Sequence, residues 1–424
     1  MKVHSNLRKL RVLSLFSGCG GLDLGFEGGF KALREAACAD MLTSSGNARK
    51  NKWVLLPKTR FETVFANDIR EDAKLAWENF FSQNKSVFRL ESIVDLVKAH
   101  KEAGDVFPAN VDVVTGGFPC QDFSVAGKRH GFKSHKTHNG GKASIDSPSL
   151  ENRGQLYIWM REVIDIARPK VFIAENVKGL VEFGNIKDII ESDFSRVAGN
   201  GYLVVPAKVL HAADYGVPQS RERVIFIGFK RSALAVGALK ELSKNPISPE
   251  YEPYPAPTHS YTTHSENLLP PITVSQAFAD LDEPEISKDT AQQKYSKAKY
   301  MGKHCQGQTE VNLCGVGPTI RAEHHGNIEY RRLSVENGGK HVEELAKGLK
   351  ERRLTVRECA RLQTFPDEYE FVIPKTKDKK GVSASGAYRL IGNAVPPLLG
   401  YAIARQLEKN WGLYFGGGED DCID

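Results

Sequence analysis

The chain lacks several features that would define its class at once. No apolar run is long enough to span a bilayer, and the first residues have no signal-peptide-like apolar core, so we expect a cytoplasmic protein without a membrane partner. The seven cysteines, odd in number and scattered from Cys19 to Cys422, argue against a disulfide framework. His and Cys residues between positions 304 and 325 lack the close spacing of zinc ligands, so no metal is expected.

The composition is that of an ordinary soluble globular protein, with 41% hydrophobic and 26% charged residues. A chain of 424 residues can bury a sizeable core and suggests two domains, or one domain with a large insertion. The net charge of +6 is compatible with a polyanionic partner but does not demonstrate one.

A cysteine follows the most distinctive predicted strand. Residues 111–115 form a run rich in β-branched side chains, and residues 116–124 continue it as a glycine- and proline-containing loop. Cys120 is therefore expected at the carboxyl end of a strand, where ligands bind in open α/β sheets. A lone buried cysteine is usually an inert small hydrophobe, so its role depends on what lies at neighbouring strand ends.

The N-terminal region predicts a nucleotide-binding turn. Residues 10–16 read as a strand and residues 17–26 as a glycine-rich turn that opens a helix, which fits a dinucleotide oxidoreductase as well as other nucleotide binders. Residues 31–60 suggest an inserted surface loop or short helix. The next strand, residues 61–68, ends in Asp68, which either accepts the ribose hydroxyls of an adenosine or caps the following helix.

Further polar side chains lie at later strand ends. The predicted strand 169–177 ends in Glu175 and Asn176, the same place in chain order as Cys120, so these side chains can face one cleft. Arg221 and Arg223 precede another strand and lie on one face if that strand has already begun. Both suit phosphate or a carbonyl oxygen, and the alternative is a surface salt bridge with Glu222.

The character of the sequence changes after residue 230. Proline clusters and aromatic-polar runs replace the alternation of strands and helices, which predicts a separate, mostly β and loop domain. Residues 319–327 are candidates for reading base edges, and the basic residues 128–142 for a phosphate-contacting lid or a solvated loop. Helical periodicity returns at residues 354–365, and a last helix is expected at 398–407.

Six motifs together resemble the cytosine-C5 DNA methyltransferases of bacterial restriction-modification systems. In the family's linear order they are residues 16–21, 117–121, 175–177, 219–223, 353–359 and 392–397. The similarity covers residues 10–230 and 353–407. Each motif alone is weak, whereas six in order are specific.

The resemblance implies an α/β fold, a doubly wound Rossmann-like class I methyltransferase sheet with an inserted, mostly β/loop target-recognition domain. The expected divisions are an S-adenosylmethionine-binding catalytic domain (1–229), a target-recognition domain (230–352) and a C-terminal segment returning to the catalytic domain (353–424). The implied partner is double-stranded DNA, bound by a monomer. A cognate restriction endonuclease is implied genetically and not as a physical partner.

The resemblance also implies a mechanism. Cys120 adds as a thiolate to C6 of a flipped-out cytosine, and the activated C5 then takes the methyl group of S-adenosylmethionine. Glu175 neutralises N3 and accepts from the exocyclic amine, while Arg223 holds the O2 edge. Arg221 supports the loop or a phosphate, and Asn176 belongs to the same catalytic group. No residue is assigned to removal of the C5 proton.

The remaining site predictions concern the two ligands. Cofactor binding is expected of Phe16, Ser17, Gly18, Cys19, Gly20, Gly21, Asp68, Ile69, Gly117, Phe118, Pro119, Asn393 and Ala394. DNA binding is expected of Gln121, Ser124, Lys128, Arg129, Arg153, Arg321 and His324. The sequence departs from the family at Ile69, where an aromatic residue is usual, and at the acid near the adenine, which is Glu91 or absent.

Three other functions compete with this prediction. An RNA cytosine methyltransferase has the same catalytic domain, but a sizeable region between Arg223 and Arg353 favours duplex DNA. A nicotinamide-dependent oxidoreductase leaves Cys120 and Glu175 unexplained. A catalytically dead DNA-binding relative is disfavoured because both of those residues are present.

Overall fold

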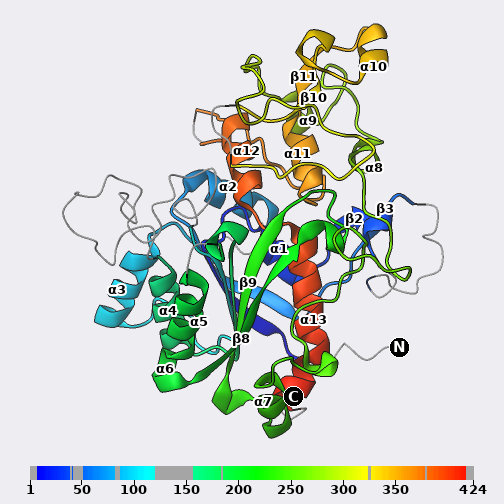
Figure 1. The fold of residues 1–424 in the computed structure, drawn as a ribbon. Helices are drawn as coiled ribbons and strands as arrows, with labels where there is room; N and C mark the ends of the chain where they lie inside the picture. Colours follow the sequence, from blue (N-terminus) through cyan, green and yellow to red (C-terminus); the bar gives the residue numbers. More distant parts are fainter. Residues whose placement is uncertain are drawn as a thin grey trace.

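The computed structural model describes residues 7–38, 41, 51–81, 86–119, 156–182, 185–322, 326–377 and 380–416 (Figure 1). In this part of the chain seven strands form one sheet in the order β5-β4-β1-β6-β7-β9-β8. Their bounds are β1 Leu10–Leu15, β4 Phe61–Asn67, β5 Phe88–Arg89, β6 Val113–Gly117, β7 Val171–Val177, β8 Tyr202–His211 and β9 Glu222–Lys230. Neighbouring strands from β5 to β7 are parallel. The strand β9 runs in the opposite direction and pairs in antiparallel fashion with β7 and with β8.

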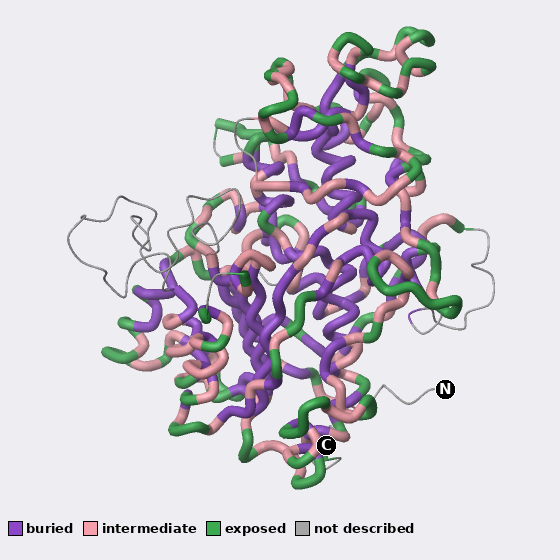
Figure 2. Tube along the Cα trace, viewed as in Figure 1, coloured by how far each residue is buried: buried purple, intermediate pink, exposed green. Residues whose placement is uncertain are grey.

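Helices cover both faces of this sheet, which is why its strands are apolar nearly throughout. Alternate side chains of β1 enter different cores, Val12 on one face and Leu13 on the other. One core includes α1 (Gly21–Glu27), α2 (Glu71–Phe80) and α13 (Pro397–Phe415), and the other α3 (Ile93–Ala103), α4 (Leu156–Ala167) and α5 (Ile186–Ser195). Figure 2 shows the buried residues concentrated along the strands and these helices. The predicted α/β class is confirmed.

The C-terminal segment packs back onto the first helix of the chain. A Cβ on Gly25 of α1 would lie 2.5 Å from the carbonyl oxygen of Pro397, so the two helices touch backbone to backbone. Proline at the first position of α13 suits a helix start, where no intrahelical partner for an amide is lost. The helix continues to Phe415, beyond the predicted end at residue 407.

Two shorter helices precede α13. Thr355 and Glu358 form a capping box at the start of α11 (Val356–Leu362), in which each side chain bonds the other's backbone amide. Ser383 caps α12 (Ala384–Asn393) through the amide of Gly386. In Figure 1, α11 and α12 lie between the central sheet and the outer part of residues 230–352.

The prediction of an inserted loop or short helix at residues 31–60 missed two strands, although one turn of 3-10 helix follows the first of them at Arg34–Ala36. Strands β2 (Lys31–Leu33) and β3 (Trp53–Leu55) pair in antiparallel fashion, with Leu33 opposite Trp53. Ala32 and Val54 are buried at the centre of the pair, whereas Lys31 and Leu55 are exposed. This alternation is the pattern of a half-buried ribbon.

Residues 230–352 contain little regular structure, as expected of a loop-rich region, but they are not mostly β. The described α-helices are α7 (Val236–Leu242), α8 (Val274–Phe278), α9 (Thr290–Gln293) and α10 (Val342–Ala346), with short 3-10 turns between them. The strand β10 (Tyr330–Arg332) pairs with β11 (Arg352–Arg353). Buried arginines connect the loops. Arg353 donates to the carbonyl groups of Ala298 and Ile328, and Arg352 bonds Glu283 and Glu358. Bonds from side chains thus replace much of a strand ladder.

Candidate active site

Two of the predicted catalytic side chains, those of Glu175 and Arg223, meet at the carboxyl edge of the parallel strands. Gly117, at the end of β6, lies opposite Glu175 on β7, and Arg223 on β9 lies opposite Val177. The strand β6, which leads to Cys120, and the strand β7, which carries Glu175, are therefore adjacent, as the chain order suggested. Pro119 is the last described residue before Cys120, which lies outside the described residues.

Glu175 and Arg223 form an ion pair in which Arg223 Nε lies 2.6 Å from Glu175 Oε1. Each side chain is only 10% exposed. Burial raises the pKa of Glu175, and the charges of Arg223 and Arg221 offset this rise only in part. A carboxyl group with a raised pKa, held at a strand end, is suited to hold or share a proton.

The proposed salt bridge between the arginines and Glu222 was wrong. The carboxylate of Glu222 bonds the Lys178 ammonium at 3.0 Å, while Arg223 uses only the backbone carbonyl of Glu222, at 2.7 Å. Arg223 is thereby fixed from two sides, by Glu175 and by the backbone of its own strand.

Gly117 is required by its distance from Glu175. A Cβ at this position would lie 2.8 Å from Glu175 Oε2, so a larger residue would displace the carboxylate. Asn176 donates from Nδ2 to the carbonyl oxygen of Phe118 at 3.2 Å and accepts from the Val177 amide. Asn176 therefore positions the segment that leads to Cys120, with no described contact to Arg223 or Glu175.

Arg221 does not share the face of Arg223, because β9 begins only at Glu222. Its guanidinium is 1% exposed and donates to the carbonyl groups of Ile320, Gly392 and Ala394. Of the two roles expected for Arg221, these contacts favour support of a loop over a phosphate contact.

Most of the predicted cofactor residues, namely residues 16–21, Asp68 and Ile69, lie at the ends of β1 and β4, and residues 117–119 lie at the end of the neighbouring strand β6. Phe16 and Gly18 have φ of 53° and 54°, a sharp reversal that brings the turn back to β4. The Ser17 amide donates to the carbonyl of Asn67 at 2.8 Å, and the Gly18 amide to Asp68 Oδ2 at 3.1 Å. Asp68 also accepts from the Arg70 amide, but the N-cap of α2 is Arg70, so the capping alternative for Asp68 was wrong.

Asp68 and Ile69 present different chemistry beside this turn. Burial raises the pKa of Asp68, and two backbone amides oppose the rise. Ile69 is 39% exposed although it is a large apolar residue. A glycine turn after β1, together with a carboxylate and an apolar side chain after the neighbouring strand β4, fits the amino-acid part, the ribose and the adenine of S-adenosylmethionine.

The C-terminal residues predicted for this site also reach it. A Cβ on Gly21 would lie 3.2 Å from the Ala394 side chain and 2.3 Å from the Val395 carbonyl oxygen. Asn393, the last residue of α12, is exposed beside this contact. The thiol of Cys19 is buried 3.6 Å from the Leu390 carbonyl oxygen, so only the Cys19 backbone can serve the cofactor.

Comparisons with known proteins identify the family. A family model described as C-5 cytosine-specific DNA methylase matches residues 10–409. The chain belongs to this family. The type II methyltransferase M.BsuRI of Bacillus subtilis is 33% identical over 98% of this chain and 82% of its own length. M.NgoPII of Neisseria gonorrhoeae is 27% identical over 94% and 96%, respectively.

A solved structure supports the fold. The Dnmt2 methyltransferase of S. pombe covers 95% of this chain, and 99% of its own chain is matched, with a TM-score of 0.54 at 17% identity. The chain is a C-5 cytosine-specific DNA methylase that uses S-adenosylmethionine, so the activity and the cofactor predicted from the sequence are confirmed.

Several residues predicted to serve the methylase lie outside the described residues. They are Cys120, Gln121, Ser124, Lys128, Arg129, Arg153 and His324. Arg321 is described, and its Nη2 lies 2.8 Å from Glu329 Oε1 and 3.3 Å from the Asn327 carbonyl oxygen. Its guanidinium is thus already engaged within residues 230–352, the predicted target-recognition domain, which we call the recognition region. The backbone carbonyl of Glu91 accepts from Asn67 at 2.7 Å, which fixes the end of β4.

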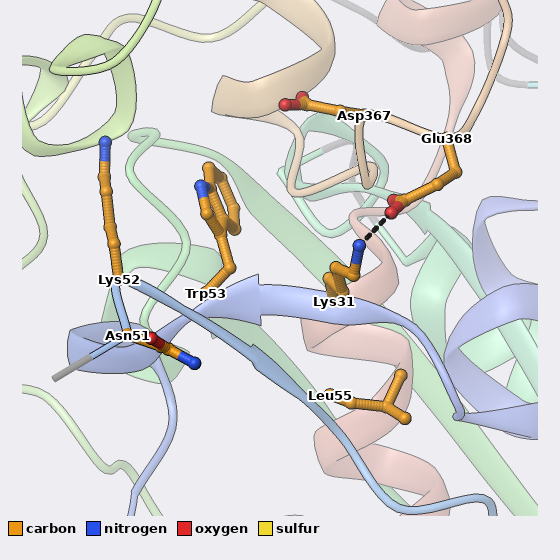
Figure 3. A pocket seen from close by; sticks show the side chains of 7 residues that line it. All are labelled: Lys31, Asn51, Lys52, Trp53, Leu55, Asp367 and Glu368. Carbon is orange, nitrogen blue, oxygen red and sulfur yellow. Dashed lines mark hydrogen bonds and ion pairs between the residues drawn. The ribbon is translucent and has the colours of Figure 1, made fainter. Parts of the chain in front are cut away.

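A surface pocket of the methylase lies elsewhere, on the β2–β3 ribbon (Figure 3). Its lining is Lys31, Asn51, Lys52, Trp53, Leu55, Asp367 and Glu368. Lys31 and Glu368 form an ion pair across it. None of the predicted catalytic or cofactor residues lines this pocket. Among the described residues, no group of three His, Cys, Asp or Glu side chains could hold a metal ion, and no helix is long and apolar enough to cross a membrane.

Sequence reasoning missed a buried carboxylate beneath the cofactor turn. Asp23 accepts from Ser14 Oγ at 2.5 Å and from Trp77 Nε1 at 2.8 Å, and Ser17 Oγ donates to Ser14 Oγ at 2.8 Å. Burial raises the pKa of Asp23 to about 6, although both hydrogen bonds oppose the rise. The local sequence around Asp23 does not indicate that this residue is buried, because it does not show that Trp77 covers it.

Replacing Asp23 with asparagine is expected to flatten part of the pH dependence of stability. Because the folded pKa is raised, Asp23 favours folding below about pH 4, and this contribution is lost as the pH rises through about 6. The variant should therefore gain up to about 3 kcal/mol relative to wild type between these pH values. Urea unfolding at both ends of the range measures this, with the surface variant Asp188→Asn as control. A wild-type slope in Asp23→Asn would contradict the assignment.

Proposed function

We propose that this methylase modifies C5 of a flipped-out cytosine within a short duplex sequence through a covalent adduct of Cys120. The observation that carries the proposal is the buried pair of Glu175 and Arg223 beside the Gly117-Phe118-Pro119 segment that leads to Cys120. Glu175, Arg223 and the segment that leads to Cys120 all belong to one chain, which supports a monomer as the active unit.

Cytosine C5 is too poor a nucleophile to take a methyl group unaided. Addition of the Cys120 thiolate to C6 places electron density at C5 and negative charge on the ring. Glu175, with its raised pKa, shares a proton with N3 and accepts from the exocyclic amine, which distinguishes cytosine from thymine. Arg223, held by Glu175 and by the Glu222 carbonyl, presents its remaining donors to O2.

The cofactor supplies an electrophilic methyl carbon, and this chain's own residues hold it. Asp68 would accept from the ribose, Ile69 would contact the adenine, and the turn at residues 16–21 would cover the rest. Transfer of the C5 proton to a base such as water then restores the C5–C6 double bond and expels Cys120 as the thiolate. A target inside a stacked duplex cannot reach Cys120 or Glu175, so the nucleotide must be extruded at a cost of about a few kcal/mol.

The biological role follows from the relatives named as type II methyltransferases. We propose that the modified site is protected from a cognate restriction endonuclease. The endonuclease would recognise the same sequence without binding the methylase, since each enzyme reads the DNA separately.

Methylation of a duplex library tests this function. Wild-type protein and S-adenosylmethionine are incubated with duplexes that contain random positions, and 5-methylcytosine is mapped at base resolution. A single short motif, modified at one cytosine, is expected. Methylation of total tRNA in a parallel reaction, without modification of DNA by a folded protein that binds S-adenosylmethionine, would overturn the proposal.

A further inference from the structure

A buried polar junction joins the catalytic strand β9 to the recognition region and to the cofactor side of the molecule. Four segments meet there, namely the residues just before β9, residues 317–322, the end of α11 and the end of α12. Gln219, Arg221 and Gln363 supply its side chains, and each is at most 1% exposed.

Two of these side chains hold one residue of the recognition region. Gln219 Oε1 accepts from the Ile320 amide at 2.9 Å, and Arg221 Nη1 donates to the Ile320 carbonyl at 3.1 Å. Between them, the Ser220 amide donates to the Gly317 carbonyl at 2.7 Å, and Thr319 Oγ1 donates to the Ser220 carbonyl. Residues 317–320 are thus fixed in register against the chain that enters β9.

The same side chains hold the end of α12. Arg221 Nη2 donates to the carbonyl groups of Gly392 at 2.9 Å and Ala394 at 2.8 Å. Gln363 accepts from Gln219 at 2.8 Å and donates to the Ile391 carbonyl at 2.6 Å. There is no space for adjustment here, because a Cβ on Gly392 would lie 2.2 Å from the Arg321 carbonyl carbon.

The junction connects a predicted DNA contact with a predicted catalytic residue. Ile320 is followed by Arg321, a predicted DNA contact, and Arg221 stands two residues before Arg223. A shift of residues 317–321 must therefore either carry Arg221 with it or leave buried amide and guanidinium groups without partners, which is costly. If Arg221 moves with these residues, Arg223 is displaced from Glu175.

We propose that Gln219 and Arg221 are positioning residues that make the alignment of Arg223 depend on the register of residues 317–321. The inference rests on the proposed function, since it assumes that Arg223 contacts the target base. Under it, a wrong DNA sequence lowers the rate of methyl transfer as well as the affinity. Sequence discrimination is then expressed in kcat and not only in binding.

The test compares Gln219→Glu and Arg221→Lys with wild type. Gln219→Glu keeps the shape but loses the amide donor, and Arg221→Lys keeps the charge but loses the forked geometry. The control is Tyr254→Phe, which removes a buried 2.9 Å hydrogen bond to the Ile225 carbonyl of the same strand without touching the junction. Thermal unfolding and S-adenosylmethionine binding establish that each variant is folded.

Each protein methylates the random duplex library, and rates at the wild-type motif and at singly altered motifs are measured with KM for DNA. Both junction variants are expected to lose about 10- to 100-fold in kcat with KM changed less than about threefold. Their preference for the motif over altered sites should fall about tenfold or more. Tyr254→Phe should keep the wild-type preference.

Unchanged preference in folded junction variants would overturn the inference, as would an equal loss of preference in Tyr254→Phe. If neither junction variant folds, Thr319→Val removes only the hydroxyl bond to Ser220 and must lower the preference by itself. A wild-type protein that methylates no DNA would instead overturn the proposed function.

Discussion

Cys120→Ser protein is expected to transfer no measurable methyl group to DNA while binding S-adenosylmethionine as tightly as wild type. A thiol ionises near neutral pH when cations are close, whereas a serine hydroxyl does not, so addition to C6 fails at its first step. The loss should be at least about 1,000-fold, as is typical when a catalytic nucleophile is removed. Residues 16–21, Asp68 and Ile69, which follow β1 and β4, are expected to hold the cofactor without the thiol. Serine differs from cysteine by one atom, so residues 117–119 before it should keep their place.

A radiolabelled methyl-transfer assay measures this loss, and DNA with fluorine at C5 of the target adds a second readout. Fluorine cannot leave as the proton does, so wild type should accumulate as a covalent complex on a denaturing gel. Cys120→Ser should form none. Cys314→Ser, a change at an exposed cysteine, should behave as wild type in both assays. Turnover by Cys120→Ser would remove the nucleophile assignment.

The centre of the fold was predictable because its signals are local. Residues 111–115 and 169–177 are mostly apolar, a pattern typical of strands that are buried on both faces. The structure places β6 and β7 in these two segments. Since parallel strands end at the same edge, the positions that follow them were expected to meet, and Gly117 lies opposite Glu175. The positions of these residues at the ends of successive strands were therefore enough to predict that they lie close together.

The junction and the β2–β3 ribbon were not predictable for the opposite reason. Gln219 and Gln363 are ordinary polar residues in the sequence. Their partners are each other and backbone carbonyl or amide groups, all more than twenty residues away. Likewise β2 and β3 are short strands separated by an unrelated segment, so their pairing has no local signal. Whether Arg221 shares a face with Arg223 depended on where the strand begins, and the start of a strand cannot be located to one residue from its sequence.

Glu175→Gln protein is expected to lose at least about 100-fold in kcat while still binding DNA, in the range that a lost general acid produces. Glutamine can donate to N3 but cannot transfer a proton to it. Burial raises the pKa of Glu175, so the wild-type rate should fall toward alkaline pH as this carboxyl group loses its proton. Glu175→Gln should lack this alkaline limb, since it has no group to ionise.

The control for this prediction is Glu222→Gln, which removes a carboxylate at the start of β9 that bonds Lys178 and leaves the Arg223 pair in place. It should retain the rate and the pH profile of wild type. Glu175→Gln also leaves the Arg223 charge without its carboxylate, so thermal unfolding must show that the variant is folded. If a folded Glu175→Gln kept the wild-type alkaline limb, another group would hold the proton at N3. In that case the ion pair of Glu175 and Arg223 would serve only to orient the arginine.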